Sequence, residues 1–427
     1  MSILIGIVIL FLVLVTFHEY GHYSVARFFK IKILKFSIGF GPDIFNWRNK
    51  DGIKFSLSAL PFGGYVAFHD PADVANYSKL SSNDKKYVLA NRPAFEKGLV
   101  TLAGPFFNFV LSFFIFAFVG FFMPRESDIV TAKILDSEDE KLYQVLNVND
   151  VPIKNAQELE IELFKNSGFT GNLQIDLFDY QDQKNLTIDK NVTNLSFPQD
   201  KSPSSFFNLS PFLDYSPYIS SLTESSVAEN IGLEEGDLIT GINDYKIFST
   251  IQANQLLNQY GISFYITVLR DGKSLFFILP AKNEGEFLGI SLVPDKNSFF
   301  DSLAYGANQT VFWITNTFNF LIRTFTGSLG LDNLSGPVGI AKVAGDSLAS
   351  GLIPYLLLLA ILSISLGAFN LLPLPMLDGG QFLFILVEEL KGSPINLKLK
   401  AALFNLSYLL IISLTIFVVI NDIGRLA

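Results

Sequence analysis

Four long apolar stretches dominate the pattern of hydrophobic and polar positions along the chain. They cover residues 1–28, 98–123, about 351–372 and 402–420. Each is long enough for a helix, which rises about 1.5 Å per residue, to cross the ~30 Å apolar core of a membrane. A signal peptide is the alternative for the first stretch, but no Lys or Arg precedes it and no small-residue cleavage site follows it. The pattern therefore predicts a polytopic α-helical membrane protein with about four transmembrane helices.

Between the first two apolar stretches, residues 29–97 contain alternating runs typical of short strands. Two of these runs, FSIGFG at 36–41 and IKFSLSAL at 53–60, flank the turn-forming residues 49–52. Glycines within and after the runs favour bends and close approach of the backbone. We expect a membrane-associated β-hairpin at about 36–66, which can dip into the membrane where it lines a protected cavity.

The segment 125–295 combines short strand-like runs with a weak internal repeat. The sequence VAENIGLEEGDLITGINDYKI at 227–247 has a degenerate counterpart, KLYQVLNVNDVPIKNAQEL, at 141–159. Two copies of one small β-rich domain are expected, over 125–205 and 206–295, and the polar stretch that ends the first range has the composition of a linker.

Residues 298–325 have apolar side chains at helical spacing, interrupted by Asp301, Asn308, Asn316 and Arg323. These polar residues make a membrane span unfavourable. We therefore expect an amphipathic helix that lies at the membrane interface.

The distribution of charge predicts an orientation. Residues 27–97 carry 12 Lys and Arg against 6 Asp and Glu, whereas residues 124–350 carry 15 against 29. The positive-inside tendency then places 29–97 and the short basic loop 388–400 in the cytoplasm, and the acidic segment outside. The net charge of −9 argues against nucleic acid, because phosphate binding requires a basic surface.

The motif His-Glu-Tyr-Gly-His at 18–22 carries the clearest chemistry. Positions i and i+4 share one face of a helix, so the imidazoles of His18 and His22 can bind one zinc ion. Glu19 lies beside them, where it can take a proton from water. Ionisable residues inside a membrane helix are costly and mark function by default. The alternative is a buried Glu–His pair that only holds helices together.

A catalytic zinc ion requires a third protein ligand, and Asp378 is the best candidate. The chain has no cysteine and only three histidines, so few other ligands exist. Pro373 and Pro375 exclude regular helix just before Asp378, and the two glycines that follow it allow a tight turn. The alternative is an Asp378 that caps the helix expected at 381–390.

Seven motifs along the chain together carry a resemblance to a known family. In order they are HEYGH in the first span, SIGFGP (37–42), LPFGGYV (60–66), AGPFFNF (103–109), GLEEGDLITGIND, NLSGPVGIAK (333–342) and NLLPLPMLDGGQ (370–381). The chain resembles the site-2 protease family of intramembrane zinc metalloproteases in the order and approximate spacing of these motifs. The combination of HExxH in a first membrane helix with a later NxxPxPxxDG is highly specific.

The resemblance implies zinc ligands His18, His22 and Asp378, with Glu19 as the general base. It also implies a membrane-associated hairpin and tandem external PDZ-like domains. Asn370 resembles the active-site asparagine of the family, and Pro373 and Pro375 resemble residues that shape the substrate groove.

The implied substrates are transmembrane segments of single-span membrane proteins, such as an anti-sigma factor cut after a first external cleavage, in an envelope-stress response. The implied location is the bacterial inner membrane, with the PDZ-like domains in the periplasm and the active site near the cytoplasmic side. The PDZ-like domains would bind peptide tails.

The chain departs from the family pattern at some positions. Gln381 stands where relatives often have His, and Ser365 stands where they often have Asn. The first PDZ-like copy is poorly marked.

Two other functions fit parts of the pattern. A non-catalytic membrane adaptor would bind protein tails through PDZ-like domains and hold a structural metal, but a structural site should have four ligands and we find three. A metal transporter would need polar residues in several spans, and the second and fourth apolar stretches have essentially none.

Overall fold

The computed structural model describes residues 2–426, apart from 72, 125–126, 128, 136–140, 180–181, 183, 198–201, 213, 259–262, 282–287, 293–296 and 328–333. The chain forms two compact units, which we describe separately. Unit 1 contains residues 1–120 and 299–427, and unit 2 contains residues 121–298.

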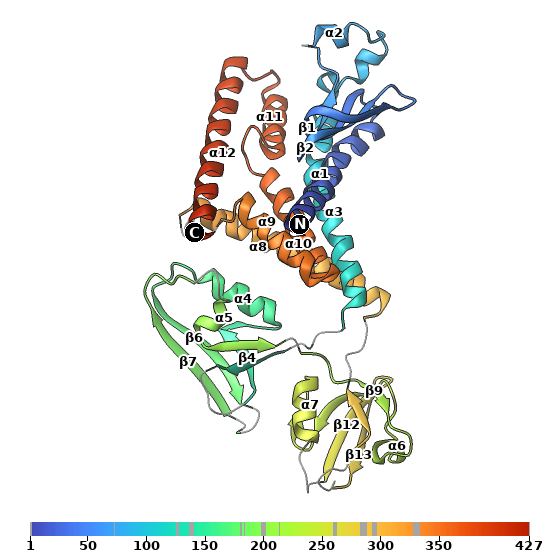
Figure 1. Ribbon diagram of the computed structural model, residues 1–427, viewed down its shortest axis with the longest axis vertical. Coiled ribbons are helices and arrows are strands. Elements are labelled where there is room, and N and C mark those ends of the chain that lie inside the picture. Colours follow the sequence, from blue (N-terminus) through green and yellow to red (C-terminus); the bar gives the residue numbers. More distant parts are fainter. Residues whose placement is uncertain are drawn as a thin grey trace. The chain divides into compact units, whose positions relative to one another are not determined.

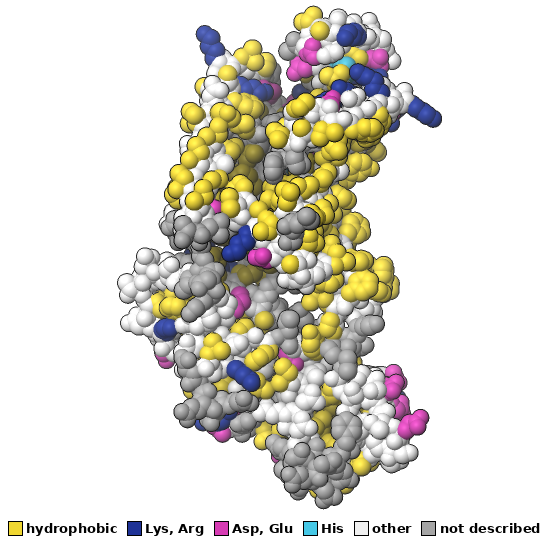
Figure 2. Space-filling model, viewed as in Figure 1, with side chains coloured by type: hydrophobic (Ala, Val, Ile, Leu, Met, Phe, Trp, Pro, Cys, Tyr) yellow, Lys and Arg dark blue, Asp and Glu magenta, His cyan; other side chains and the backbone are white. Residues whose placement is uncertain are grey.

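Within the described residues, four helices are long and apolar enough to cross a membrane, as the sequence predicts. They are α1 (Ser2–Phe28), α3 (Ala94–Phe122), α10 (Leu352–Asn370) and α12 (Leu397–Leu426). Helices α3 and α12 begin several residues before the apolar stretches that predict them, because their first turns are polar. On the face shown in Figure 2, hydrophobic side chains cover these long helices.

Further helices and helical turns belong to unit 1 (Figure 1). They are α2 (Val74–Tyr77), two 3-10 turns (Asp84–Tyr87 and Leu89–Asn91), α8 (Phe299–Phe325), α9 (Pro337–Ser350) and α11 (Asp378–Lys391). Helix α8 has the helical spacing expected from the sequence. The sequence analysis did not predict α9, which packs against α1 and α10. Small residues mediate this contact, since a Cβ on Gly6 of α1 would lie 2.9 Å from the carbonyl oxygen of Ala344.

The predicted hairpin is present, but its pairing is richer than expected. Strands β1 (Ile33–Arg48) and β2 (Lys54–Phe68) pair in two antiparallel runs, from Arg48↔Lys54 to Asp43↔Ser58 and from Ile33↔Phe68 to Ile38↔Gly64. A third run, from Lys35↔Lys54 to Ile38↔Leu57, proceeds in the same direction on both strands. Each long strand therefore bends and supplies two pairing segments.

A carboxylate ties the two halves of β1 to β2. Asp43 forms ion pairs with Lys35 at 2.9 Å and with Lys54 at 2.6 Å. Hydrogen bonds from Lys54 and Lys35 hold the pKa of the Asp43 carboxyl well below its usual range. The carboxylate is thus ionised at neutral pH and joins segments that the bend brings together.

Helix α12 is attached to the rest of unit 1 near its C-terminal end. The buried carboxylate of Asp422 accepts hydrogen bonds from the backbone N–H groups of Gly336 at 3.0 Å and Gly339 at 2.8 Å, at the start of α9. A helix N-terminus favours a negative charge through its unpaired N–H groups and its dipole. A Cβ at Gly336 would lie 2.7 Å from the same carboxylate, so this attachment requires a glycine.

Unit 2 contains two lobes with the same succession of strands (Figure 1). The first lobe has β3 (Val130–Ile134), β4 (Tyr143–Val148), β5 (Val151–Pro152), α4 (Ala156–Lys165), β6 (Gly171–Asp179), β7 (Lys184–Val192), α5 (Pro203–Phe206) and β8 (Leu209–Phe212). The second has β9 (Ile219–Leu222), α6 (Val227–Asn230), β10 (Leu238–Ile242), β11 (Tyr245–Lys246), α7 (Thr250–Leu257), β12 (Phe264–Arg270), β13 (Lys273–Leu279) and β14 (Ile290–Leu292). Helices α4 and α7 hold corresponding places in the two lobes, whereas the short helices α5 and α6 do not.

Four strand pairs correspond between the lobes, whereas the β3–β4 pair of the first lobe has, among the described residues, only the single bridge Tyr218↔Leu238 as its counterpart. The pairs β4–β5, β4–β6, β6–β7 and β3–β8 in the first lobe correspond to β10–β11, β10–β12, β12–β13 and β9–β14 in the second. Each lobe encloses its own hydrophobic core. The shared succession and pairing support the internal repeat that the sequence suggests.

A charged pair secures the second lobe. Asp237 is fully buried, and Arg270 of β12 donates to its two oxygens at 2.6 and 2.7 Å. The guanidinium also donates to Glu234 at 2.6 Å and to the carbonyl of Gly232 at 2.9 Å. This bidentate pair joins the turn before β10 to the end of β12.

We predict that Arg270→Leu destabilises the second lobe by about 3 kcal/mol, because the substitution leaves the Asp237 carboxylate buried without its partner. Hydrogen exchange of the intact chain, followed by mass spectrometry, should show faster exchange in β10, β12 and β13. The control is Lys273→Ala, an exposed position on the same hairpin. Unchanged exchange in Arg270→Leu would contradict the prediction.

Candidate active site

His18, Glu19 and His22 lie in the second half of α1, within one of the candidate membrane helices. The spacing of four residues puts both imidazoles on one face of the helix. His18 and Glu19 are each 8% exposed. Two rings and a carboxylate are therefore held inside an apolar unit, where unpaired polar groups are costly.

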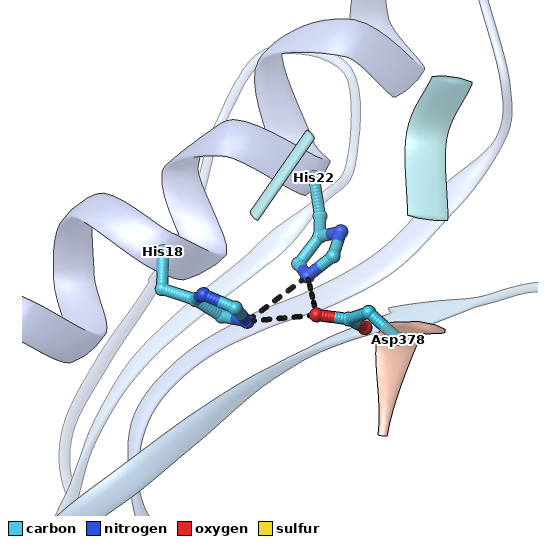
Figure 3. A group of neighbouring side chains, drawn as sticks. All are labelled: His18, His22 and Asp378. Atoms are coloured by element: carbon cyan, nitrogen blue, oxygen red, sulfur yellow. Dashed lines mark hydrogen bonds and ion pairs between the residues drawn. The ribbon is translucent and has the colours of Figure 1, made fainter. Parts of the chain in front are cut away.

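Asp378 joins the two histidines from the other end of the sequence (Figure 3). Its Oδ2 atom lies 3.2 Å from Nε2 of His18 and 3.6 Å from Nε2 of His22, and the two Nε2 atoms are 3.3 Å apart. This oxygen is buried and, despite the short distances, has no hydrogen bond of good geometry. Among the described residues, this is the one group of three or more such side chains close enough to share a metal ion.

The three distances fit a zinc ion. Zinc binds nitrogen and oxygen ligands at about 2.0–2.2 Å in a tetrahedron, so its ligand atoms should lie about 3.3–3.6 Å from one another. The observed separations of 3.2, 3.3 and 3.6 Å agree with that geometry. Three ligands also leave the fourth position of a tetrahedron open, as in catalytic sites.

The turn that precedes α11 positions Asp378. Asp378 is the first residue of α11, and no side chain caps this helix, so the capping alternative is not observed. A Cβ on Gly379 would collide with the carbonyl of Leu371, and one on Gly380 with that of Leu374. The two glycines thus let the turn fold back closely onto the start of the helix. Neither has positive φ, so close approach is their role rather than the tight turn expected from the sequence.

Close packing between α1 and α3 fixes the histidine rings. A Cβ on Gly21 would lie 2.8 Å from the carbonyl carbon of Ala103, so the two backbones are nearly in contact. A Cβ on Gly104 would collide with the imidazole of His22 and lie 2.8 Å from Cε1 of His18. Small residues commonly allow membrane helices to approach in this way.

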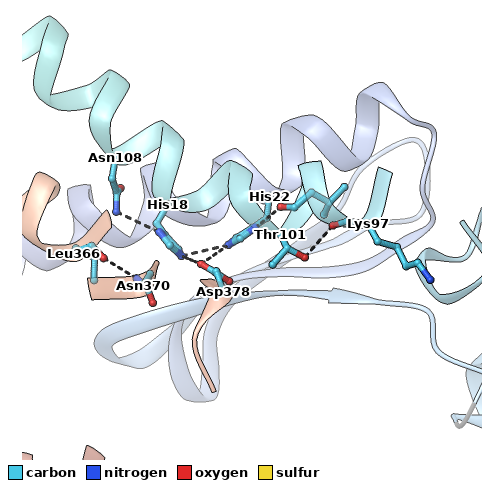
Figure 4. A network of polar contacts seen from close by, with 9 residues as sticks. His18, His22, Lys97, Thr101, Asn108, Leu366, Asn370 and Asp378 are labelled. Carbon is cyan, nitrogen blue, oxygen red and sulfur yellow. Dashed lines mark hydrogen bonds and ion pairs between the residues drawn. The ribbon is translucent and has the colours of Figure 1, made fainter. Parts of the chain in front are cut away.

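The other nitrogen of each ring also faces α3 (Figure 4). Nδ1 of His22 donates to the carbonyl of Val100 at 2.7 Å, and Nδ1 of His18 lies 3.2 Å from the side-chain nitrogen of Asn108. Asn108 was not predicted from the sequence, where the second span has essentially no polar residues by its overall pattern. A buried amide in an uncharged span, within the AGPFFNF motif, was the available signal.

Glu19 contacts β2 rather than the metal-ligand atoms. The backbone of Val66 lies close to its carboxylate. A Cβ on Gly64 would lie 3.0 Å from Cγ of Glu19 and 2.7 Å from the side chain of Val15. The sheet thus lies directly against the part of α1 that carries the site.

The other residues singled out from the sequence lie on α10, on α11 or in the turn between these helices. Asn370 ends α10, near Asp378 in Figure 4, and its side-chain nitrogen donates to the carbonyl of Leu366 at 3.0 Å. Pro373 and Pro375 lie in the turn between α10 and α11. Gln381 is exposed on α11.

His69 lies just after β2 and outside the cluster. Burial lowers the pKa of its imidazole, which favours the neutral ring.

The sequence matches the model of Peptidase family M50 over residues 6–414. It is 31% identical to a regulator of sigma E protease of Haemophilus influenzae, with 97% of each chain covered. It is 31% identical to a Pasteurella multocida protein with zinc metalloprotease in its name, with 98% of each covered. The regulator of sigma-E protease of Escherichia coli is 26% identical, with 97% of this chain and 96% of the relative covered.

We predict that Gly104→Ala lowers the affinity for zinc at least about tenfold, although it changes no candidate ligand. The added methyl group would push the imidazoles from their positions, and groups that orient ligands typically affect metal affinity by this amount. Competition with a chelator measures the effect. The control is Gly424→Ala on α12, where an added Cβ meets no atom within 4 Å. Equal affinities in the two variants would contradict the role of this contact.

Proposed function

Because the chain belongs to peptidase family M50 and is a zinc metalloprotease of the site-2 type, we propose that it cuts transmembrane segments of single-span membrane proteins. His18, His22 and Asp378 would bind the zinc ion, and Glu19 would act as the general base. The observation that carries this proposal is the convergence of three candidate ligand atoms, with Glu19 beside them, within an apolar helical unit.

The residues divide the chemical work between them. When bound, zinc supplies Lewis-acid chemistry, because it polarises a carbonyl and makes water more acidic. Glu19 takes the proton from the attacking water and passes it to the nitrogen of the departing amine. Asn370 can donate a hydrogen bond to the substrate peptide once its amide leaves the carbonyl of Leu366.

The substrate has to lose its helical structure locally, because a helix hides its peptide bonds in internal hydrogen bonds. The β2 segment 64–68 pairs with β1 and reaches Glu19 at Val66. We propose that the unwound substrate lies beside this sheet or beside the 371–377 turn and pairs with exposed backbone there. Pro373 and Pro375 would shape that groove, since they keep the turn out of helical conformation.

A non-catalytic adaptor is the second candidate. It would use the repeated lobes of unit 2 to bind peptide tails and would hold a structural metal. The group of three candidate ligands favours catalysis, because a structural zinc site is closed by four. Glu19 is buried next to that group. Its carboxylate would have no function in an adaptor, which also favours catalysis.

Further parts of the proposal follow from the resemblance and from the names of the relatives. The two lobes of unit 2, within 125–205 and 206–295, would be PDZ-like domains on the periplasmic side of a bacterial inner membrane. Residues 29–97 and 388–400 would face the cytoplasm, and α8 would lie at the membrane interface. Because relatives are named regulators of sigma E protease, an anti-sigma factor is the expected substrate class, within an envelope-stress response.

We predict opposite zinc contents for two inactive variants. Glu19→Gln should abolish cleavage of a model single-span substrate but keep zinc, since Glu19 acts on protons and is not a ligand. Asp378→Ala should lose both cleavage and most of the zinc. Metal analysis of the purified proteins and a co-expression cleavage assay provide the measurements.

His69→Ala is the matched control for this pair and should keep both zinc and activity. A Glu19→Gln protein without zinc would contradict the role of Glu19 as base, and full zinc content in Asp378→Ala would require another third ligand.

We also predict that deletion of the outer lobes, residues 125–295, keeps the chemistry but loosens the choice of substrate. All candidate catalytic residues lie in unit 1, so the lobes can act only on access. The deletion variant should cut an untrimmed substrate with a folded external domain that the intact protein spares. Loss of cleavage of a pre-trimmed substrate, in a folded and zinc-loaded variant, would instead show that the lobes present substrate.

A further inference from the structure

The inference concerns Asn108, the buried amide on α3 next to His18. Its side chain is fully buried, and its Nδ2 atom lies 3.2 Å from Nδ1 of His18. Its Oδ1 atom is also buried and has no hydrogen-bond partner. An amide enclosed in this way in a membrane helix is costly unless its polar atoms are used.

The chemistry of a metal-bound histidine determines which amide atom should face the ring. A neutral imidazole that offers the lone pair of Nε2 to a metal carries its proton on Nδ1, which is then a donor. His22 already has this arrangement, since its Nδ1 is 2.7 Å from the Val100 carbonyl, which can only accept. His18 needs an acceptor at Nδ1 as well, and an amide nitrogen cannot serve as one.

We propose that Asn108 is a positioning residue whose amide oxygen accepts the Nδ1–H of His18, so that the Nε2 lone pair faces the metal. The two ends of a side-chain amide have nearly the same shape, and their assignment rests on the hydrogen-bond network. Exchanging them brings the unpartnered oxygen to the ring, and the two N–H···O contacts then orient both histidines. The inference rests on the proposed role of His18 as a zinc ligand.

The arrangement of α3 supports this role. Val100, Gly104 and Asn108 are spaced by four residues and therefore share one face of the helix. The first faces His22, the second leaves room for both rings, and the third faces His18. The backbone carbonyl of Asn108 accepts hydrogen bonds from Ser112 at 2.9 Å and from Ser363 of α10 at 2.9 Å, which connect this part of α3 to α10.

Two substitutions at Asn108 separate an acceptor from a donor and from simple packing. Asn108→Leu has a similar shape but no polar atoms, and Asn108→Asp can only accept when ionised. We expect Asn108→Leu to lower zinc affinity 10–100-fold, and Asn108→Asp to keep it within about threefold of the unsubstituted chain. Chelator competition in detergent measures both, and the absorption spectrum of the cobalt-loaded proteins reports the ligand geometry.

Ser363→Ala is the matched control, because it removes a hydrogen bond to the backbone of Asn108 and leaves the amide in place. The carbonyl keeps its bond from Ser112, so zinc affinity should stay unchanged. Equal affinity in Asn108→Leu and the unsubstituted chain would overturn the inference. A loss in Asn108→Asp as large as that in Asn108→Leu would also overturn it, because the amide would then act as a donor.

A direct measurement does not depend on the folding of any variant. The chain has three histidines, so ¹⁵N-histidine labelling gives a simple nuclear magnetic resonance spectrum of the zinc-loaded protein. Two of the three rings should carry a hydrogen-bonded proton on Nδ1 and none on Nε2. If the Nδ1 proton of His18 is present but not hydrogen-bonded while zinc is bound, the role of Asn108 is wrong and the ligand assignment stands. If the unsubstituted chain binds no zinc, both fail.

Discussion

Gly21 brings the backbone of α1 into contact with that of α3, and Gly104 leaves the space on α3 in which the two histidine rings lie. The other features of the site depend on this contact. It presses the imidazoles against α3, where the Val100 carbonyl and the Asn108 amide meet their Nδ1 atoms. The Nε2 atoms then face away from α3 and toward Asp378. Two glycines thus define the positions of polar groups that an apolar surrounding would otherwise disfavour.

Asp378 completes the cluster from a turn rather than from a long helix. The α10–α11 connection folds back on itself at Gly379 and Gly380, and its prolines prevent it from becoming helical. This close packing fixes where Asp378 meets the two histidines. The β2 segment near Glu19 borders the same space. The three candidate ligands, Glu19 and β2 therefore belong to three parts of unit 1 that meet at one place.

Much of this architecture could be predicted from the sequence. The spans follow from hydropathy alone, and the pairing of His18 with His22 follows from helical periodicity. Helix α9 was not predicted, because its contacts depend on small residues such as Gly345 that give a weak hydrophobic pattern. The doubled pairing of β1 and β2 was also missed, because local alternation does not report which strands meet after a bend. Asn108 was not predicted to matter, because its contact is with His18, which lies 90 residues away in the chain.

The attachment of α12 to α9 has a consequence for the evolution of this protein. Gly336 and Gly339 leave space for Asp422 and donate their N–H groups to it, across 86 and 83 positions of sequence. A larger residue at Gly336 would fit only after Asp422 had been shortened, and a shortened Asp422 would leave the start of α9 without its acceptor. The three positions therefore constrain one another, and substitutions at them should be inherited together rather than drift one at a time.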